Sequence, residues 1–287
     1  MKLWIAGARP RTLPAAVVPV LVGLGVASGG ANVAWWRAAP ALVVSLALQV
    51  GVNYANDYSD GIRGTDEVRV GPMRLVGSGA VPASRVKAAA FTAFGVAALA
   101  GLVIAVTTSL WLLLVGVAAI AAAWFYTGGK NPYGYMGLGE VFVFVFFGVV
   151  ATVGTTYAVT GRLPSLAWVA SLPVGALACA LLVINNLRDI PTDAVSGKKT
   201  LAVRLGDGRT RTFYVVLCWG AGLCVVGAAV QRPAAILGLL GLFAVMPAVR
   251  IIRSGATGRD LIAALGVTGR AQMIFGLLFA VGLVVGS

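Results

Sequence analysis

Long runs without a charged residue constrain this chain more than any other feature. Residues 88–129 are uncharged over 42 positions, and seven further runs cover 12–36, 38–56, 141–161, 163–187, 212–231, 233–249 and 271–287. A transmembrane helix needs about 20 apolar residues, so the longest run has room for two helices with a turn near residues 107–109. The runs are continuous rather than alternating, which favours helices over a barrel. The sequence therefore predicts an all-α membrane protein of nine transmembrane helices, the last beginning at 271 or earlier, near Leu261.

The composition agrees with a single integral-membrane domain over residues 1–287. Only 11% of the residues are charged, against about 25% in a soluble domain. The net charge of +13 does not indicate nucleic acid as a partner, because the bases lie in short gaps between apolar runs. The chain has no histidine, which excludes histidine catalysis and histidine metal ligands.

The distribution of bases predicts the orientation. If the N-terminus is inside, only Arg37, Arg162 and Arg232 of the 22 bases fall outside, and the other 19 fall inside. Such a bias follows the positive-inside rule and places the C-terminus outside. We expect a multi-pass protein of the cell inner (plasma) membrane, with its long loops, about 57–87 and 188–211, in the cytoplasm.

Most of the nine acidic residues fall in these two loops, in two clusters. Asn53, Asp57 and Asp60 share one helical face, and Asn185, Asp189 and Asp193 repeat the pattern after the sixth span. Carboxylate pairs that face each other repel unless a cation lies between them. Mg²⁺ prefers a few carboxylates together with waters and phosphates. We expect Asp57, Asp60, Asp66, Asp189 and Asp193 to bind Mg²⁺ with a diphosphate; the alternative is that they are solvated residues that terminate helices.

Basic residues accompany both clusters and match an anionic substrate. A diphosphate carries about three negative charges, which Mg²⁺ and bases would offset together. The alternative role of these bases is to keep the loops inside. We expect the diphosphate to be bound by Arg63, Arg69, Arg74, Lys130 and Lys198.

Several segments together resemble the UbiA superfamily of intramembrane prenyltransferases, and the resemblance covers the whole chain. The two acidic motifs are Asn53-Tyr-Ala-Asn-Asp-Tyr-Ser-Asp60 and Asn186-Leu-Arg-Asp-Ile-Pro-Thr-Asp193. A third aspartate common in the superfamily would fall at Gly64, where this chain offers Asp66 instead. Further matching segments begin at Ala8, Arg69, Tyr126, Gly137 and Gly197.

Within the superfamily, the chain is most similar to the branch that prenylates 1,4-dihydroxy-2-naphthoate. The resemblance implies a nine-helix bundle with Mg²⁺ as cofactor. It also implies transfer of a polyprenyl group from polyprenyl diphosphate to 1,4-dihydroxy-2-naphthoate, with loss of carbon dioxide and diphosphate, to give demethylmenaquinone. The implied catalytic residues are Asp57, Asp60, Asp189, Asp193 and Arg188.

The aromatic substrate carries a carboxylate and two hydroxyl groups, so we expect a cation and flat walls near the metal. Arg188 is the expected carboxylate anchor, since it lies beside Asp189 and one turn beyond Asn185. Asn53 and Asn185 are expected to reach the hydroxyl groups, and Tyr126 and Tyr133 to form walls or transfer a proton. The alternative role of Arg188 is only to pair with Asp189.

The sequence is compatible with three other functions. One is prenyl transfer to another aromatic acceptor, such as homogentisate or hydroxybenzoate. The second is a membrane diphosphatase that uses the same metal cluster with water as nucleophile. The third is a secondary transporter, which would need charged or broken segments near mid-membrane. The oligomeric state and the length of the prenyl tail do not follow from the sequence.

Overall fold

A computed structural model describes residues 1–65 and 73–287, and all regular structure within these ranges is helical. The α-helices are α1 (Lys2–Ala8), α2 (Pro14–Ala27), α3 (Ala38–Ile62), α4 (Ala83–Thr107), α5 (Trp111–Phe125), α6 (Gly139–Val143), α7 (Ala151–Thr160), α8 (Ser165–Val195), α9 (Leu201–Gln231), α10 (Leu237–Leu242), α11 (Met246–Arg253) and α12 (Asp260–Val285). A π-helical segment, η4 (Phe144–Val150), joins α6 to α7, and 3₁₀ turns occupy Pro10–Thr12, Trp35–Arg37, Tyr133–Met136, Pro233–Ile236 and Phe243–Val245.

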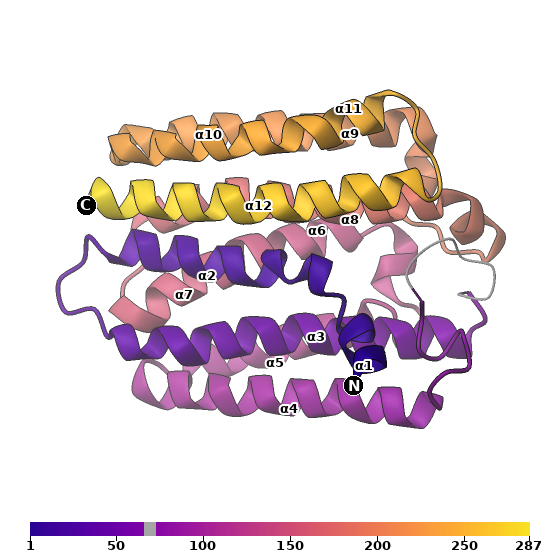
Figure 1. Ribbon diagram of the computed structural model, residues 1–287. Coiled ribbons are helices and arrows are strands. Elements are labelled where there is room, and N and C mark those ends of the chain that lie inside the picture. The colour runs from indigo at the N-terminus through magenta and orange to yellow at the C-terminus, as the bar shows by residue number, and fades with distance from the viewer. Residues whose placement is uncertain (66–72) are drawn as a thin grey trace.

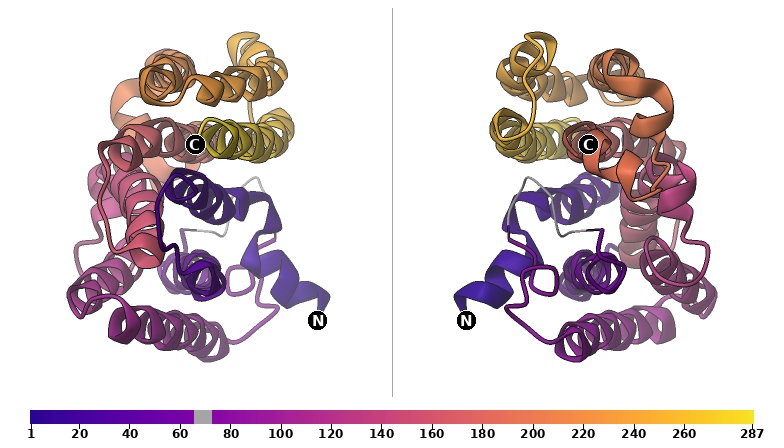
Figure 2. Two further views of the ribbon diagram at one scale, coloured as in Figure 1. Left: turned by 90° about the vertical axis from the view of Figure 1, so that its left-hand side faces the viewer. Right: turned by 90° about the vertical axis from the view of Figure 1, so that its right-hand side faces the viewer.

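The long helices run side by side along one direction (Figure 1). Seen along that direction, α9 to α12 (orange to yellow) lie on one side of the bundle, and α3 to α5 (violet to magenta) lie on the other (Figure 2). The most buried of the candidate spans is α8: 78% of its most apolar stretch is buried. Small residues let helices approach it closely, as is usual in membranes. A Cβ at Gly148 would lie 2.5 Å from Gly175 Cα, so η4 and α8 meet almost backbone to backbone.

Seven helical stretches of the described chain have the length and hydropathy to cross a membrane. An eighth is the pair Lys2–Thr12 and Pro14–Ala27, if this bent pair (52°) forms one span. The remaining expected span corresponds to α5, an apolar helix of 15 residues, which is shorter than an ordinary span. The all-helical membrane architecture is thus confirmed, and the count of nine stays a prediction. The last of these helices begins at Asp260, close to the earlier of the two expected starts.

The three arginines expected on the outer face lie at one end of the bundle. Arg37 donates hydrogen bonds to the carbonyl oxygens of Ala158 and Thr107. Arg232 donates to those of Val26 and Leu283, at 3.0 and 2.6 Å, near the C-terminus marked in Figure 1. These two guanidinium groups therefore satisfy carbonyl groups that the ends of α2, α4, α7 and α12 leave without helical partners. The acidic clusters lie toward the other end.

The two segments expected as long loops contain more helix than the sequence suggested. Helix α3 continues to Ile62, and α8 continues to Val195, so both acidic clusters lie on helices. Helix α9 begins at Leu201, where the Thr200 hydroxyl accepts a hydrogen bond from the Val203 amide. This cap fixes the start of α9, so within 188–211 the chain is non-helical over 196–200 and turns at Gly206, whose φ is 76°.

Candidate active site

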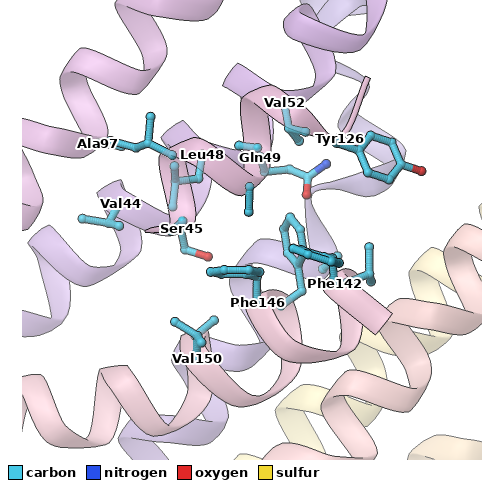
Figure 3. A pocket seen from close by; sticks show the side chains of 18 of the residues that line it. Val44, Ser45, Leu48, Gln49, Val52, Ala97, Tyr126, Phe142, Phe146 and Val150 are labelled. Carbon is cyan, nitrogen blue, oxygen red and sulfur yellow. The ribbon is translucent and has the colours of Figure 1, made fainter. Parts of the chain in front are cut away.

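A cavity of about 400 Å³ runs inside the bundle between α3, α4, α5, α7 and α8, a volume usual for a small-molecule site. One end is polar and is lined by Asp60, Asp189, Lys198, Asn185 and Asn186. The rest is mainly apolar, and Figure 3 shows Leu48, Phe142, Phe146 and Val150 around it. The cavity thus joins a charged end to a long apolar compartment.

Lys198 lies between the two acidic clusters. Its Nζ is 3.5 Å from Asp60 Oδ2 and 4.0 Å from Asp193 Oδ1, and it stands 5.0 Å from the centre of the Tyr135 ring. The Tyr135 hydroxyl donates to Asp60 Oδ1 at 2.7 Å. The ammonium group therefore occupies a position between two buried carboxylates from α3 and α8. The two clusters expected to face each other do so at Asp60 and Asp193.

Asp57 has a different environment from the one expected. Its side chain is 1% exposed and is absent from the cavity wall. Its two carboxylate oxygens accept hydrogen bonds from the backbone amides of Leu75 and Val76, both at 2.9 Å. In this structure Asp57 therefore fixes the segment that follows α3 instead of facing the cavity. The helical spacing that grouped it with Asp60 is correct, but the two positions differ by about 60° around the helix.

Arg188 forms a bidentate ion pair with its neighbour, Asp189. Its Nε and Nη2 donate to the two carboxylate oxygens of Asp189 at 2.7 and 2.8 Å, and the guanidinium side chain is 1% exposed. Asp189 lines the cavity and Arg188 does not. The geometry matches the alternative weighed for Arg188, in which it holds Asp189, and does not place it as the anchor of an aromatic carboxylate.

The paired asparagines do not have matching roles. The Asn53 amide donates to the Ala8 carbonyl oxygen at 2.9 Å and to the Thr12 hydroxyl at 3.1 Å, so it ties α3 to the N-terminal segment. The Asn185 amide donates to the Leu181 carbonyl oxygen at 3.3 Å. Both residues line the cavity, but Asn53 bonds to a segment far away in the chain, whereas Asn185 bonds within its own helix.

The predicted phosphate-binding bases are also dispersed. Arg63 donates to the carbonyl oxygens of Thr127 and Gly129 and lies outside the cavity wall, so it joins α3 to the loop after α5. Lys130 is exposed and lies outside that wall as well. Arg74 is buried and lines the cavity, as does Lys198. The structure thus brings two of the expected bases, Arg74 and Lys198, to the site.

An aromatic wall begins at the loop after α5. Tyr126 meets Tyr133 edge to face at 5.5 Å, Tyr133 stacks on Phe142 at 3.9 Å, and Phe142 stacks on Phe146 at 6.2 Å. All four line the cavity. Burial, followed by the Glu140 carboxylate, raises the pKa of Tyr126 well above its usual value, so this hydroxyl stays protonated at neutral pH. The Tyr133 hydroxyl donates to the Ala122 carbonyl oxygen.

Two expected site residues, Asp66 and Arg69, lie outside the residues that the structure describes. Among residues 1–65 and 73–287, no three acidic or cysteine side chains lie close enough together to hold one metal ion. Mg²⁺ commonly keeps several waters and binds one or two carboxylates with substrate phosphates, so a pair of carboxylates still suits it.

The sequence did not single out several residues that shape the polar end. Gln49 lines the cavity and donates to the Thr12 hydroxyl at 3.0 Å. Asn186 donates to Glu140 Oε1 at 2.9 Å, so α6 is tied to α8 inside the bundle. Glu140 does lie in one of the segments that carried the resemblance, and its place beside an apolar run was a signal. Nothing in the local pattern distinguished Tyr135.

Comparison with known proteins agrees with this geometry. Residues 16–265 match the UbiA prenyltransferase family. The chain is 50% identical to a 1,4-dihydroxy-2-naphthoate octaprenyltransferase of Mycobacterium tuberculosis, over 99% of this chain and 97% of that one. It is 31% identical to the Bacillus subtilis enzyme of the same name, over 96% and 90% of the two chains.

Solved structures share the fold. A UbiA homolog from Aeropyrum pernix K1 has a TM-score of 0.73 at 15% identity, over 93% of this chain and 97% of that one. A UbiA homolog from Archaeoglobus fulgidus, bound to GPP and Mg²⁺, has a TM-score of 0.67 at 15% identity, over 96% and 99%. The family match covers most of the chain, and the fold and the cavity agree with it: this protein belongs to the UbiA prenyltransferase family.

Proposed function

We propose that this protein transfers a polyprenyl group from polyprenyl diphosphate to 1,4-dihydroxy-2-naphthoate. The relatives with this name cover nearly the whole chain at up to 50% identity. The observation that carries the proposal in the structure is the Asp60–Lys198–Asp193 arrangement at the polar end of an apolar cavity. A lipid diphosphate has the same two parts, a charged head and a long apolar tail.

Mg²⁺ is the proposed cofactor, and the residues present suit it. The Lys198 ammonium lies between the Asp60 and Asp193 carboxylates, where a positive charge reduces their repulsion. Asp189 lines the same end of the cavity. Asp60 and Asp193 are the proposed pair of ligands, and Asp189 is proposed to contact the ion through a bound water; other waters and the diphosphate complete the coordination. Asp57 is proposed to orient the 74–76 segment that carries Arg74. When bound, Mg²⁺ offsets negative charge on the diphosphate and so makes it a better leaving group.

The side chains around the cavity have distinct proposed roles. Lys198 and Arg74 bind the diphosphate oxygens by charge-assisted hydrogen bonds. The allylic C–O bond breaks, and its electron pair leaves with the diphosphate. Tyr133, Phe142 and Phe146 form an aromatic part of the cavity wall, and the π-electrons of this wall are proposed to favour a nearby carbocation. The apolar wall keeps out the water that would capture this cation.

The acceptor completes the reaction through its own electrons. The ring carbon that bears the carboxylate attacks the allylic carbon, and a new C–C bond forms. The bond to the carboxylate then breaks, its electron pair returns to the ring, and carbon dioxide leaves. The product is the prenylated hydroquinone, which gives demethylmenaquinone when a separate oxidant removes two electrons. Asn185 and Asn186 are the polar groups proposed to contact the ring hydroxyls.

The proposed location is the inner (plasma) membrane, with the active site on the cytoplasmic side. The support is the distribution of bases: Arg37 and Arg232 lie at the end of the bundle away from the acidic clusters. The apolar product tail also favours lipid, by about 0.8 kcal/mol for each buried methylene.

The test is an assay of membranes that contain the protein, with one prenyl diphosphate and a panel of aromatic acids. Carboxyl-labelled 1,4-dihydroxy-2-naphthoate should release labelled carbon dioxide in step with prenylated product, and excess chelator should stop both. Faster prenylation of homogentisate or hydroxybenzoate than of 1,4-dihydroxy-2-naphthoate would show that the proposed acceptor is wrong. Release of phosphate without any aromatic acid would instead indicate a diphosphatase.

A further inference from the structure

The floor of the cavity, at its apolar end, is a small cluster of side chains. Ala41 of α3, Ile104 of α4 and Ala158 of α7 are buried together, with Leu112 of α5 packed against them. All four line the cavity. Behind them, Arg37 and the Thr108 hydroxyl both donate to the Ala158 carbonyl oxygen. This floor is therefore held in place by hydrogen bonds between helices.

Three glycines line the cavity one helical turn above the floor. Gly101 comes three residues before Ile104, Gly116 four residues after Leu112, and Gly154 four residues before Ala158. These spacings place each glycine on the same side of its helix as the floor residue, about 5 Å nearer the polar end.

Open space faces all three of these glycines. A Cβ built at Gly116 or Gly154 has no atom within 4 Å, and one at Gly101 meets only Val44 Cγ2, at 3.8 Å. Close helix packing is the usual reason for glycine in a membrane helix, and Gly148 is an example. It does not explain these three, which are glycines where the fold itself leaves room for a larger side chain.

Helix α3 gives the distance between the three glycines and the polar end of the cavity. Val44 lies 16 residues before Asp60, so the glycines stand about 24 Å from the acidic cluster at 1.5 Å per residue. An isoprene unit has four main-chain bonds and extends by about 5 Å at ordinary bond lengths. Extended tails of two or three units end before the glycines, and a tail of five or more units reaches them.

We propose that Gly101, Gly116 and Gly154 determine which prenyl tails the enzyme accepts, by leaving room for the part of the tail beyond about the fourth isoprene unit. The inference rests on the proposed function and deepens it, because it assigns the apolar end of the cavity to the distal part of the donor. The side chains of Leu102 and Val117 line the cavity and are also 45% and 66% exposed. The cavity therefore approaches the surface between α4 and α5, and this is the proposed route by which a tail longer than the cavity continues into lipid.

The test measures kcat/KM for geranyl, farnesyl and octaprenyl diphosphate in the full-length protein and its variants. Gly154→Leu and Gly101→Leu should lower kcat/KM for octaprenyl diphosphate by roughly tenfold or more, because the new side chain would overfill the space that the bound tail occupies. The values for geranyl and farnesyl diphosphate should stay within about twofold. Gly154→Val provides a smaller obstruction and should give a smaller loss confined to the same donor.

Gly95→Leu is the matched control. Gly95 also lies on α4, but it is exposed and is not part of the cavity wall, and a Cβ built there has no atom within 4 Å. This variant should leave kcat/KM unchanged for all three donors. Equal losses for short and long donors, or no loss for octaprenyl diphosphate in a variant whose thermal unfolding matches the parent, would overturn the proposal. Failure of the proposed function is distinguishable, because the parent protein would then prenylate 1,4-dihydroxy-2-naphthoate with none of the donors.

Discussion

Lys198 and Asp60 are 138 positions apart in the chain, yet Lys198 Nζ lies 3.5 Å from Asp60 Oδ2. The same ammonium is 4.0 Å from Asp193 Oδ1, so one lysine from the short connection between α8 and α9 links both acidic clusters. A cation at this point reduces the repulsion between two carboxylates in a partly dry site. Binding of Mg²⁺ and diphosphate would then release Lys198 to contact the phosphate oxygens.

Replacement of this lysine tests its place at the diphosphate. Lys198→Met keeps the length of the side chain and removes the charge. We expect KM for the prenyl diphosphate to rise by roughly tenfold, the effect of about 1.4 kcal/mol of lost interaction, with little change in KM for the aromatic acid. Steady-state kinetics with each substrate varied in turn will measure both constants. A rise confined to the aromatic acid would move Lys198 to the other substrate.

Asp57 and Asp60 should behave differently although they belong to one motif. Asp57→Ala removes the acceptor of two backbone amides, so it should lower the free energy of unfolding by about 2–4 kcal/mol as well as reduce turnover. Asp60→Ala should abolish turnover with a much smaller effect on thermal unfolding, because Asp60 faces the cavity. Equal thermal stability of the two variants would contradict the structural role of Asp57.

Arg188→Lys tests the role of the bidentate pair. An ammonium cannot reproduce the two parallel hydrogen bonds that Arg188 makes to Asp189. If Arg188 orients Asp189 for the metal, the Mg²⁺ concentration for half-maximal rate should rise by several fold, and KM for the aromatic acid should change little. Titration of the rate with Mg²⁺ at saturating substrates measures this. An increase confined to KM for the aromatic acid would restore Arg188 as the carboxylate anchor.

Tyr126 should act only in its protonated form. Burial and nearby carboxylates raise its pKa well above 10, so the phenol is neutral across the working range and cannot serve as a general base there. The pH profile of kcat/KM between about pH 6 and pH 9 should therefore keep its shape in Tyr126→Phe. The folded state favours the neutral phenol. The contribution of Tyr126 to the free energy of unfolding is therefore fully present below pH 10 and is lost as the pH rises above 10. A displaced alkaline limb in Tyr126→Phe would contradict this.

Reporter fusions test the orientation of the bundle. Fusions at Arg162 and Arg232 should report the outer face, and fusions at Lys130 and Arg253 the cytoplasm, as the positive-inside rule requires. A cytoplasmic signal at Arg162 or Arg232 would show that the map is wrong. A fusion after Ser287 gives an independent check, since it should also report the outer face.

The sequence by itself determined the helical membrane architecture and the family, and it named part of the cavity lining, namely Asp60, Arg74, Asp189 and Lys198. Runs longer than the bilayer requires leave the backbone no alternative to helices, so this level of structure follows from hydropathy alone. Helical spacing assigned Asp60 and Asp193 to one helical face in each cluster, and both lie near the ends of helices, on α3 and α8. Lys198 was among the bases expected beside them.

Only the tertiary structure decided which members of each motif reach the cavity. Asp57 and Asp60 are three residues apart, and the small rotation between them directs one toward backbone amides and the other toward Lys198. Arg188 donates to Asp189, and Lys130 is exposed instead of lining the cavity. Local pattern fixes spacing along one helix, whereas the partner of a side chain depends on which other helix packs beside it. The open space at Gly101, Gly116 and Gly154 is set in the same way, by the distances between helices far apart in the chain.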